Sequence, residues 1–193
     1  MKKNKKFISI IFKSKPRDSE INLLIDFLKG LLGSYIEPSM NGNILTVIFE
    51  PIEDVSFEEI INGLNNDFYI TTSLFESGVI YDSVNVNDYI EYIASISNKI
   101  LESNNYYVDE NLIVKLNLCN DIIEKNIFKS YYKDEEMLEV VRAYLDSNMN
   151  ISKAANMLYM HRNTVMNKID KFISVTGYDI KKFSNAFIIY RFL

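Results

Sequence analysis

The stretch AANMLYMHRNTVMNKIDKF, residues 154 to 172, contains the chain's only histidine, His161, within the tetrapeptide His-Arg-Asn-Thr. Just before it, the segment SKAANML predicts a short helix with Ser152 as its N-cap. Residues 159–161 predict a turn, and the apolar spacing that follows predicts a second helix over about 162–175. A helix, a short turn and a second helix of these lengths predict a helix-turn-helix.

The second predicted helix has two chemically different sides and ends at Gly177, the residue type best able to adopt the left-handed conformation. At about 100° per residue, its apolar side is expected to contain Val165, Met166, Ile169, Phe172 and Ile173. Its polar side is expected to contain Asn163, Thr164, Asn167, Lys168 and Lys171. Asn can pair with adenine, Thr can meet a thymine methyl group, and Lys can reach guanine or phosphate. The polar side therefore has the chemistry of a recognition helix, although any solvated surface helix also shows a polar side.

The C-terminal part of the chain is basic, although the whole chain is acidic with a net charge of −5. From residue 148 to 193, seven Lys or Arg stand against two acids, a balance of +5. Residues 1–147 carry 14 basic and 24 acidic side chains, a balance of −10. A basic end on an acidic body is typical of a polyanion-binding module joined to a sensing or assembly domain.

The first part of the chain alternates strand-like and helix-like segments. Strands are predicted at 7–12, 44–50 and 68–75, with a weaker one at 34–38. Helices are predicted at 19–33, with Ser19 as a cap, and at 56–64, which opens with a Ser-x-x-Glu capping box. This β-α-β-β-α-β order is the split βαβ plan of small α/β sandwiches, a fold compatible with nucleotide sensing, dimerisation or no catalysis at all. Further helices are predicted at 87–103, 109–128 and 134–147, and a last one within 183–193, where Tyr190 and Phe192 should pack.

The C-terminal stretch LEVVRAYLDSNMNISKAANMLYMHRNTVMNKIDKFISVTGYDI resembles the helix-turn-helix of PucR/CdaR-type bacterial transcription regulators. The matching residues are Tyr144-Leu145-Asp146, Ser152, Ala155, His161-Arg162-Asn163-Thr164-Val165 and Thr176-Gly177. The resemblance covers about 60 residues at the C-terminal end. The chain departs from the family pattern where Met166, Asn167 and Lys168 stand in place of Arg, Tyr and Arg.

The resemblance implies a DNA-binding domain that follows a degenerate GGDEF-like domain, as in many such regulators. We therefore expect three parts: a degenerate GGDEF-like α/β domain over 1–82, a helical connector over 83–131 and a helix-turn-helix domain over 132–193. No GGDEF-type motif or phosphate loop is present in the sequence, so cyclase activity is not expected.

Several residues around the helix-turn-helix have more than one possible role. His161 has no partner at metal-ligand spacing, so it is expected to cap the turn or to contact a phosphate. Arg162 could contact a phosphate or form an ion pair with Asp146. The predicted DNA-contacting set is completed by Ser152, Lys153, Lys181 and Lys182. No catalytic residue, metal ligand or cofactor is predicted.

The cysteine content and the lengths of the apolar runs indicate the cellular compartment of the protein. Cys119, the only cysteine, follows an apolar pattern and is expected to be a buried thiol in a reducing environment. The apolar run 7–12 is too short for a signal peptide, and no segment approaches the roughly 20 apolar residues that span a bilayer. A cytoplasmic protein without membrane contact is expected.

The sequence as a whole predicts an α+β chain with an N-terminal α/β sandwich, a helical connector and an all-α C-terminal helix-turn-helix. The predicted function is that of a non-enzymatic transcription regulator that binds double-stranded DNA as a homodimer, because major-groove readers commonly pair to reach two half-sites. A small-molecule effector could gate it through the N-terminal domain. Two alternatives remain open: a ligand- or nucleotide-sensing module, and a helical interaction domain that has lost DNA binding.

Overall fold

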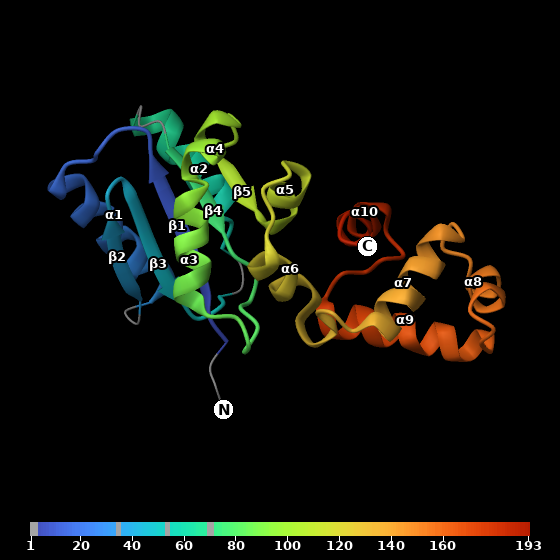
Figure 1. Cartoon of the computed structure of the whole chain (residues 1–193). Coiled ribbons are helices and arrows are strands. Elements are labelled where there is room, and N and C mark those ends of the chain that lie inside the picture. The colour runs from blue at the N-terminus through green and yellow to red at the C-terminus, as the bar shows by residue number, and fades with distance from the viewer. Residues whose placement is uncertain (1–3, 34–35, 53–54, 69–71) are drawn as a thin grey trace. The chain divides into compact units, whose positions relative to one another are not determined.

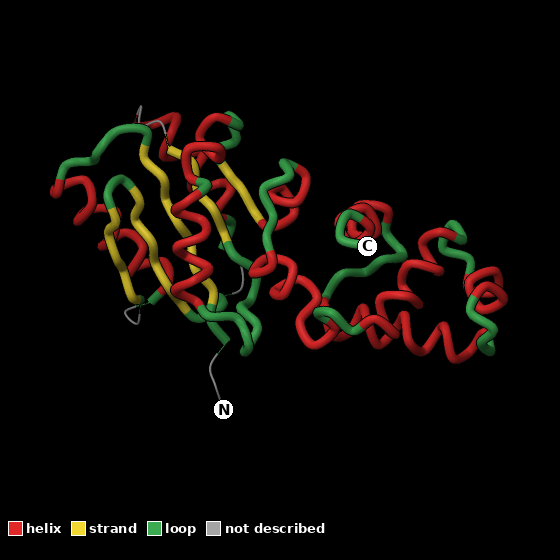
Figure 2. Tube along the Cα trace, in the orientation of Figure 1, coloured by secondary structure: helices red, strands yellow, loops and turns green. Residues whose placement is uncertain are grey.

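The computed structural model describes residues 4–33, 36–52, 55–68 and 72–193, and the chain divides into two compact units, Met1–Leu118 and Cys119–Leu193 (Figure 1). All described strands lie in the first unit, and the second unit is built of helices and loops (Figure 2). The mixed α+β fold class is thereby confirmed, with an α/β region followed by a helical one. The three-part division at residues 82 and 131 stays a prediction.

The N-terminal unit follows the predicted β-α-β-β-α-β order. Its elements are β1 (Lys6–Phe12), α1 (Asp18–Leu32), β2 (Glu37–Asn41), β3 (Ile44–Phe49), α2 (Phe57–Phe68) and β4 (Thr72–Glu76). The sheet order is β2-β3-β1-β4-β5, and β3 pairs antiparallel with both β1 and β2. Because β3 lies between β1 and β2, those two strands run parallel and are split apart, which is the split βαβ plan.

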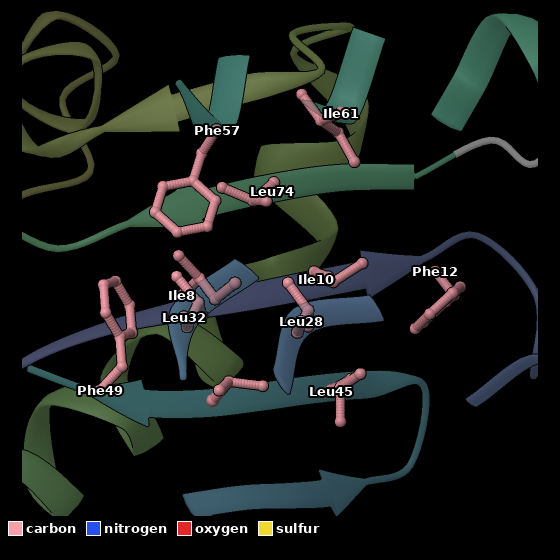
Figure 3. Packing of buried hydrophobic residues seen from close by; sticks show 11 residues of the cluster. Ile8, Ile10, Phe12, Leu28, Leu32, Leu45, Phe49, Phe57, Ile61 and Leu74 are labelled. Carbon is pink, nitrogen blue, oxygen red and sulfur yellow. The ribbon is translucent and has the colours of Figure 1, made fainter. Parts of the chain in front are cut away.

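Alternation of side chains along β1 builds the first core of this unit. Ile8, Ile10 and Phe12 point to one face of the sheet, where Leu28 of α1 and Ile61 of α2 cover them. Figure 3 shows these side chains with their labelled neighbours from β3 and β4, directed into one layer between sheet and helices. The alternate side chains of β1 point to the other face of the sheet, where a second layer of helices covers them. β1 is therefore buried on both faces.

That second layer consists of α3 (Val86–Ser95) and α4 (Ser97–Glu102). Tyr89 of α3 lies fully buried against Phe7 of β1, with ring centroids 5.1 Å apart. The Tyr89 hydroxyl donates a 2.8 Å hydrogen bond to the buried carboxylate of Glu110, which also accepts from the Gly78 N–H at 3.0 Å. Helices therefore cover both faces of the sheet, whereas the sequence placed this segment in a connector.

Two of the predicted middle helices are broken in the structure. The helix expected over 87–103 divides at Ile96 into α3 and α4. The helix expected over 109–128 divides into α5 (Glu110–Lys115) and α6 (Asp121–Phe128), because Asn117 takes a positive φ of 59° and the Asn120 side chain caps α6. The fifth strand, β5 (Tyr107–Asp109), was not predicted and pairs parallel with β4.

Smaller differences appear at the ends of the N-terminal elements. α1 begins after Arg17, whose N–H donates to Glu20 Oε2 at 2.8 Å, so Ser19 lies inside the helix and does not cap it. Phe68 ends α2 and does not begin a strand, while residues 69–71 lie outside the described part of the chain. The weak strand expected at 34–38 is β2, and its residues 34–35 are likewise outside the described part. A two-residue turn, Gly42–Asn43, joins β2 and β3 into a hairpin.

The C-terminal unit contains α6, the 3₁₀ turn η1 (Lys129–Tyr131), α7 (Glu135–Asp146), α8 (Ile151–Met157), α9 (Arg162–Thr176) and α10 (Phe183–Tyr190). Its core centres on Phe172 of α9, which stacks on Tyr131 at 5.7 Å and meets Phe128 at 6.1 Å. Phe192 packs edge-on against Phe128, as predicted, but Tyr190 is 53% exposed. Cys119 was expected to be buried and is only half-buried.

Candidate nucleic-acid interface

The helix-turn-helix consists of α8 and α9, with α7 as the helix that leads into it. The chain turns between α7 and α8 through Asn148 and Met149, which both have positive φ. Asn150 then caps α8, since its side-chain oxygen accepts the Lys153 N–H at 3.0 Å. The prediction of Ser152 as N-cap is wrong, because α8 begins at Ile151 and places Ser152 inside the first turn, where its side chain is exposed.

His161 occupies the point where the turn meets the second helix. Its backbone is extended (φ −70°, ψ 139°), and its Nδ1 accepts a hydrogen bond from the Asn163 N–H at 3.3 Å. The turn before it is closed by the Met160 N–H, which donates to the Ala155 carbonyl at 2.9 Å. The capping role expected for His161 is confirmed by this geometry. Among the described residues, no three His, Cys, Asp or Glu side chains group as a metal site.

The other end of α9 is closed by the Thr-Gly pair. Thr176 Oγ1 donates to the Phe172 carbonyl at 2.8 Å, and the Gly177 N–H donates to the Ile173 carbonyl at 2.8 Å. Gly177 adopts the left-handed conformation with φ 83°, as the sequence predicts.

The buried side of α9 is narrower than the sequence suggests. Val165, Ile169 and Phe172 are fully buried. The prediction that Met166 is buried with them is wrong, because its side chain is 40% exposed at the edge of this side. Ile173 is half-buried at the edge of the same side.

The outward side of α9 carries most of the predicted reading residues. Asn163, Thr164, Asn167 and Lys171 are all exposed. Lys168 differs from them: its side chain is 25% exposed, and Nζ lies 2.6 Å from Glu136 Oε1 of α7. This ion pair turns Lys168 toward the leader helix, so it does not join the four exposed reading residues.

The lysines that were predicted to contact phosphates differ in whether a carboxylate already pairs with them. Lys181 Nζ lies 2.7 Å from Asp170 Oδ1, and this hydrogen bond raises the pKa of the Lys181 ammonium. Lys182 Nζ lies 3.9 Å from Asp179 Oδ2, a loose contact at the protein surface. Lys153 is exposed in the first turn of α8.

Arg162 is exposed at the start of α9. Its expected alternative partner, Asp146, instead accepts a 3.0 Å hydrogen bond from the Tyr190 hydroxyl of α10. Within residues 119–193, all of which are described, no ion pair joins Arg162 to Asp146. The guanidinium therefore remains available to solvent and ligands.

Comparison with known proteins identifies this arrangement. Residues 137–191 match the family model described as the PucR C-terminal helix-turn-helix domain. The C-terminal unit carries a PucR-type helix-turn-helix. The match runs from Met137 in α7 to Arg191 after α10, so the PucR-type domain includes the leader helix and the closing helix as well as α8 and α9.

Two relatives are similar to the chain over different lengths. Uncharacterized protein YxkF of Bacillus subtilis (strain 168) is 33% identical over 57 residues, which are 30% of this chain and 19% of that protein. The match thus spans about a fifth of the length of that relative. A crystal structure of a regulator of polyketide synthase expression from Bifidobacterium adolescentis aligns with a TM-score of 0.47 at 16% identity, over 97% of this chain and 78% of that one. In the part of the chain that the structure describes, none of the helices has the length and apolar character needed to cross a membrane.

Two residues that shape this surface, Asn150 and Glu136, were missed from the sequence, and a third, Met166, was assigned to the wrong side. Asn150 could have been found, because Asn and Ser are equally good N-caps and Asn150 stands first. Met166 lies at the edge of the apolar stripe, where a helical wheel alone does not decide burial. Glu136 carries no local signal, because its pairing with Lys168 depends on how α7 and α9 approach each other.

Proposed function

We propose that the protein is a cytoplasmic, non-enzymatic transcriptional regulator that binds double-stranded DNA through its PucR-type domain. The observation that carries the proposal is the outward side of α9, where Asn163, Thr164, Asn167 and Lys171 are exposed together in a domain of that type. A helix with amide, hydroxyl and ammonium groups on its outer side suits the major groove, where base edges present donors, acceptors and methyl groups.

Two groups of residues have separate tasks in this proposal. Lys153, Arg162 and Lys171, which are all exposed, anchor phosphates, with Lys182 as a further contact. Asn163, Thr164 and Asn167 read base edges, because the first turns of a recognition helix enter the groove. Ser152 and His161 support the anchoring through the first turns of α8 and α9, where backbone N–H groups favour anions. Lys168 and Lys181 mainly hold α9 in position, since each is already paired with a carboxylate.

The regulator is proposed to act as a homodimer. A dimer places two recognition helices about 34–36 Å apart, one turn of duplex DNA. An exposed aromatic stripe on α10 supports self-association: Phe183 is 79%, Phe187 41% and Tyr190 53% exposed. At about 100° per residue these three side chains fall within about 60° of one another, and apolar surface of this kind favours burial against a second copy.

A selection from genomic fragments tests the DNA-binding proposal. The purified full chain is expected to retain a small set of duplex fragments at low salt and to release them as salt rises, because phosphate contacts displace counterions. Retention of no fragment at low salt would contradict the proposal and would favour a helical interaction domain that does not bind DNA.

A second candidate function is effector sensing by the N-terminal unit, proposed as a degenerate GGDEF-like domain. A pocket of about 700 Å³ lies among α1, α2 and the sheet, a size suited to a small organic ligand. Its apolar lining includes Ile10, Phe12, Leu23, Leu24, Phe27 and Leu64. Leu23 and Phe27 are 67% and 49% exposed, so this apolar surface remains accessible.

An apolar dye tests the pocket. Anilinonaphthalene sulfonate is expected to bind the native chain with saturating fluorescence, and Phe27→Asp should abolish that binding. Ile52→Asp is the matched control, because Ile52 is 41% exposed and does not line the pocket. Equal binding by both variants would remove the support for an effector site.

A further inference from the structure

We infer that α9 reads a half-site rich in A·T base pairs, and that Met166 contributes to this reading by contacting thymine methyl groups. The inference rests on the proposed function and adds the class of DNA sequence and a further specificity-determining residue. It follows from the burial and pairing of residues in the first two turns of α9.

Met166 lies at the edge between the buried side and the outward side of α9. It is 40% exposed, whereas its neighbour Val165 is fully buried. At about 100° per residue, Met166 stands about 60° from Asn163, and Asn167 stands about 40° from Asn163 on the other side. An exposed thioether chain therefore flanks the Asn163 amide, on the side away from Asn167.

The outward side of these two turns lacks a guanine-reading cation. Bidentate contact with guanine is made by Arg or Lys. Lys168 is held 2.6 Å from Glu136 on α7. Arg162 is assigned to a phosphate in the proposed function, and it stands about 100° around the helix from Asn163 and about 140° from Asn167.

The groups that remain match A·T pairs. Asn163 and Asn167 can each donate to adenine N7 and accept from its exocyclic amine through one amide. The Thr164 methyl and the Met166 thioether chain suit the thymine C5-methyl group, which is the only apolar group on a base edge in the major groove. Met is also the most adaptable apolar side chain for filling an irregular contact.

Two charged residues further along α9 do not change this assignment. Asp170 could accept from cytosine, but its carboxylate is paired with Lys181 at 2.7 Å. Lys171 follows one turn after Asn167, in the third turn of α9, beyond the two turns that carry the asparagines. Neither residue adds a G·C contact to the first two turns.

Replacing thymine by deoxyuridine tests the inference, because it removes only the C5-methyl group and keeps base pairing. A duplex obtained by selection is made with deoxyuridine at each thymine of a half-site in turn. Loss of one methyl contact should weaken binding of the native chain about three- to fourfold at the position that Met166 contacts. Met166→Ala should bind the thymine duplex about as weakly as the native chain binds the deoxyuridine duplex, and should show no further loss there.

Met40→Ala is the matched control, since Met40 is 38% exposed and lies on β2 in the other unit. It should keep the full deoxyuridine effect. Circular dichroism establishes that both variants keep the native helical content.

The outcomes separate the inference from the proposed function. Retention of no duplex contradicts both. Specific binding to a half-site dominated by G·C pairs, or binding of the native chain that no deoxyuridine weakens, overturns the inference and leaves DNA binding intact. A deoxyuridine effect that persists unchanged in Met166→Ala overturns the role of Met166.

Discussion

Lys168 Nζ of α9 lies 2.6 Å from Glu136 Oε1 of α7, so an ion pair joins the reading helix to its leader helix across 32 positions of sequence. The lysine side chain is 25% exposed and the glutamate side chain 72% exposed, which places the pair at the rim of the interface between helices. Two lysines three residues apart therefore differ in their surroundings: Lys168 is paired with the leader helix, and Lys171 is exposed.

Lysine substitutions should show this difference. Lys171→Ala is expected to weaken DNA binding several-fold and to reduce the dependence of affinity on salt by about one phosphate contact. Lys168→Ala should change affinity less and should lower the free energy of unfolding by less than about 1 kcal/mol, because exposed ion pairs contribute little. Fluorescence anisotropy at several salt concentrations, with urea unfolding, measures both.

Glu136→Gln is the control for the lysine pair. It releases Lys168 without removing its charge, so DNA affinity should hold or rise. A salt dependence that falls equally in Lys168→Ala and Lys171→Ala would mean that Lys168 contacts phosphate in the complex.

The start of α8 offers a test of the capping residue. Asn150→Ala removes the acceptor of the Lys153 N–H and should lower the free energy of unfolding by about 1 kcal/mol. Ser152→Ala changes an exposed position inside the first turn and should have an effect within about 0.5 kcal/mol. Urea denaturation of the two variants compares them directly, and a larger loss in Ser152→Ala would reverse the assignment.

The N-terminal unit contains a close approach between Gly78 and Glu110. A Cβ on Gly78 would lie 2.9 Å from Glu110 Oε2, and this carboxylate is buried and accepts from the Tyr89 hydroxyl. Gly78→Ala should therefore displace the carboxylate and cost about 1–3 kcal/mol of the free energy of unfolding, the usual cost of an unpaired buried polar group.

Gly30→Ala is the matched control for that substitution. Gly30 lies within α1, and a Cβ there meets nothing within 4 Å. The added methyl should stabilise the helix by roughly 0.5–1 kcal/mol, because alanine loses less backbone entropy on folding. Thermal unfolding that is unchanged in Gly78→Ala would show that Glu110 can move without loss.

The aromatic stripe of α10 predicts the oligomeric state. Phe183→Asp replaces a side chain that is 79% exposed, so the fold should tolerate it. Sedimentation equilibrium should show the native chain as a dimer and the variant as a monomer, because a charge pair at a two-fold interface repels itself. A native chain that stays monomeric at all concentrations would contradict the dimer proposal.

Local signals made much of the helix-turn-helix predictable. His161 and Gly177 act within one turn of their own positions, through a cap and a left-handed terminus, and both could be recognised in the sequence. The βαββαβ order was likewise visible, because strands and helices differ in the spacing of apolar residues. The general chemistry of the outward side of α9 followed from the helical period alone.

Relationships between distant segments could not be predicted in the same way. β5 has three residues, and it forms because the edge of β4 is available to pair with it. The exposure of Met166 and the pairing of Lys168 both depend on the angle at which α9 packs on α7, which no local pattern encodes. The sequence therefore predicted the helix itself better than it predicted which of its side chains are exposed and unpaired.

DNA binding through the C-terminal unit is best tested by the dependence of affinity on salt. The full chain and a selected duplex are titrated by fluorescence anisotropy across a range of salt concentrations. A regulator that anchors phosphates through Lys153, Arg162 and Lys171 should lose affinity linearly on a logarithmic plot, with a slope near −0.9 for each phosphate contacted. An affinity that does not change with salt, or no binding at the lowest salt, would contradict DNA binding by this protein.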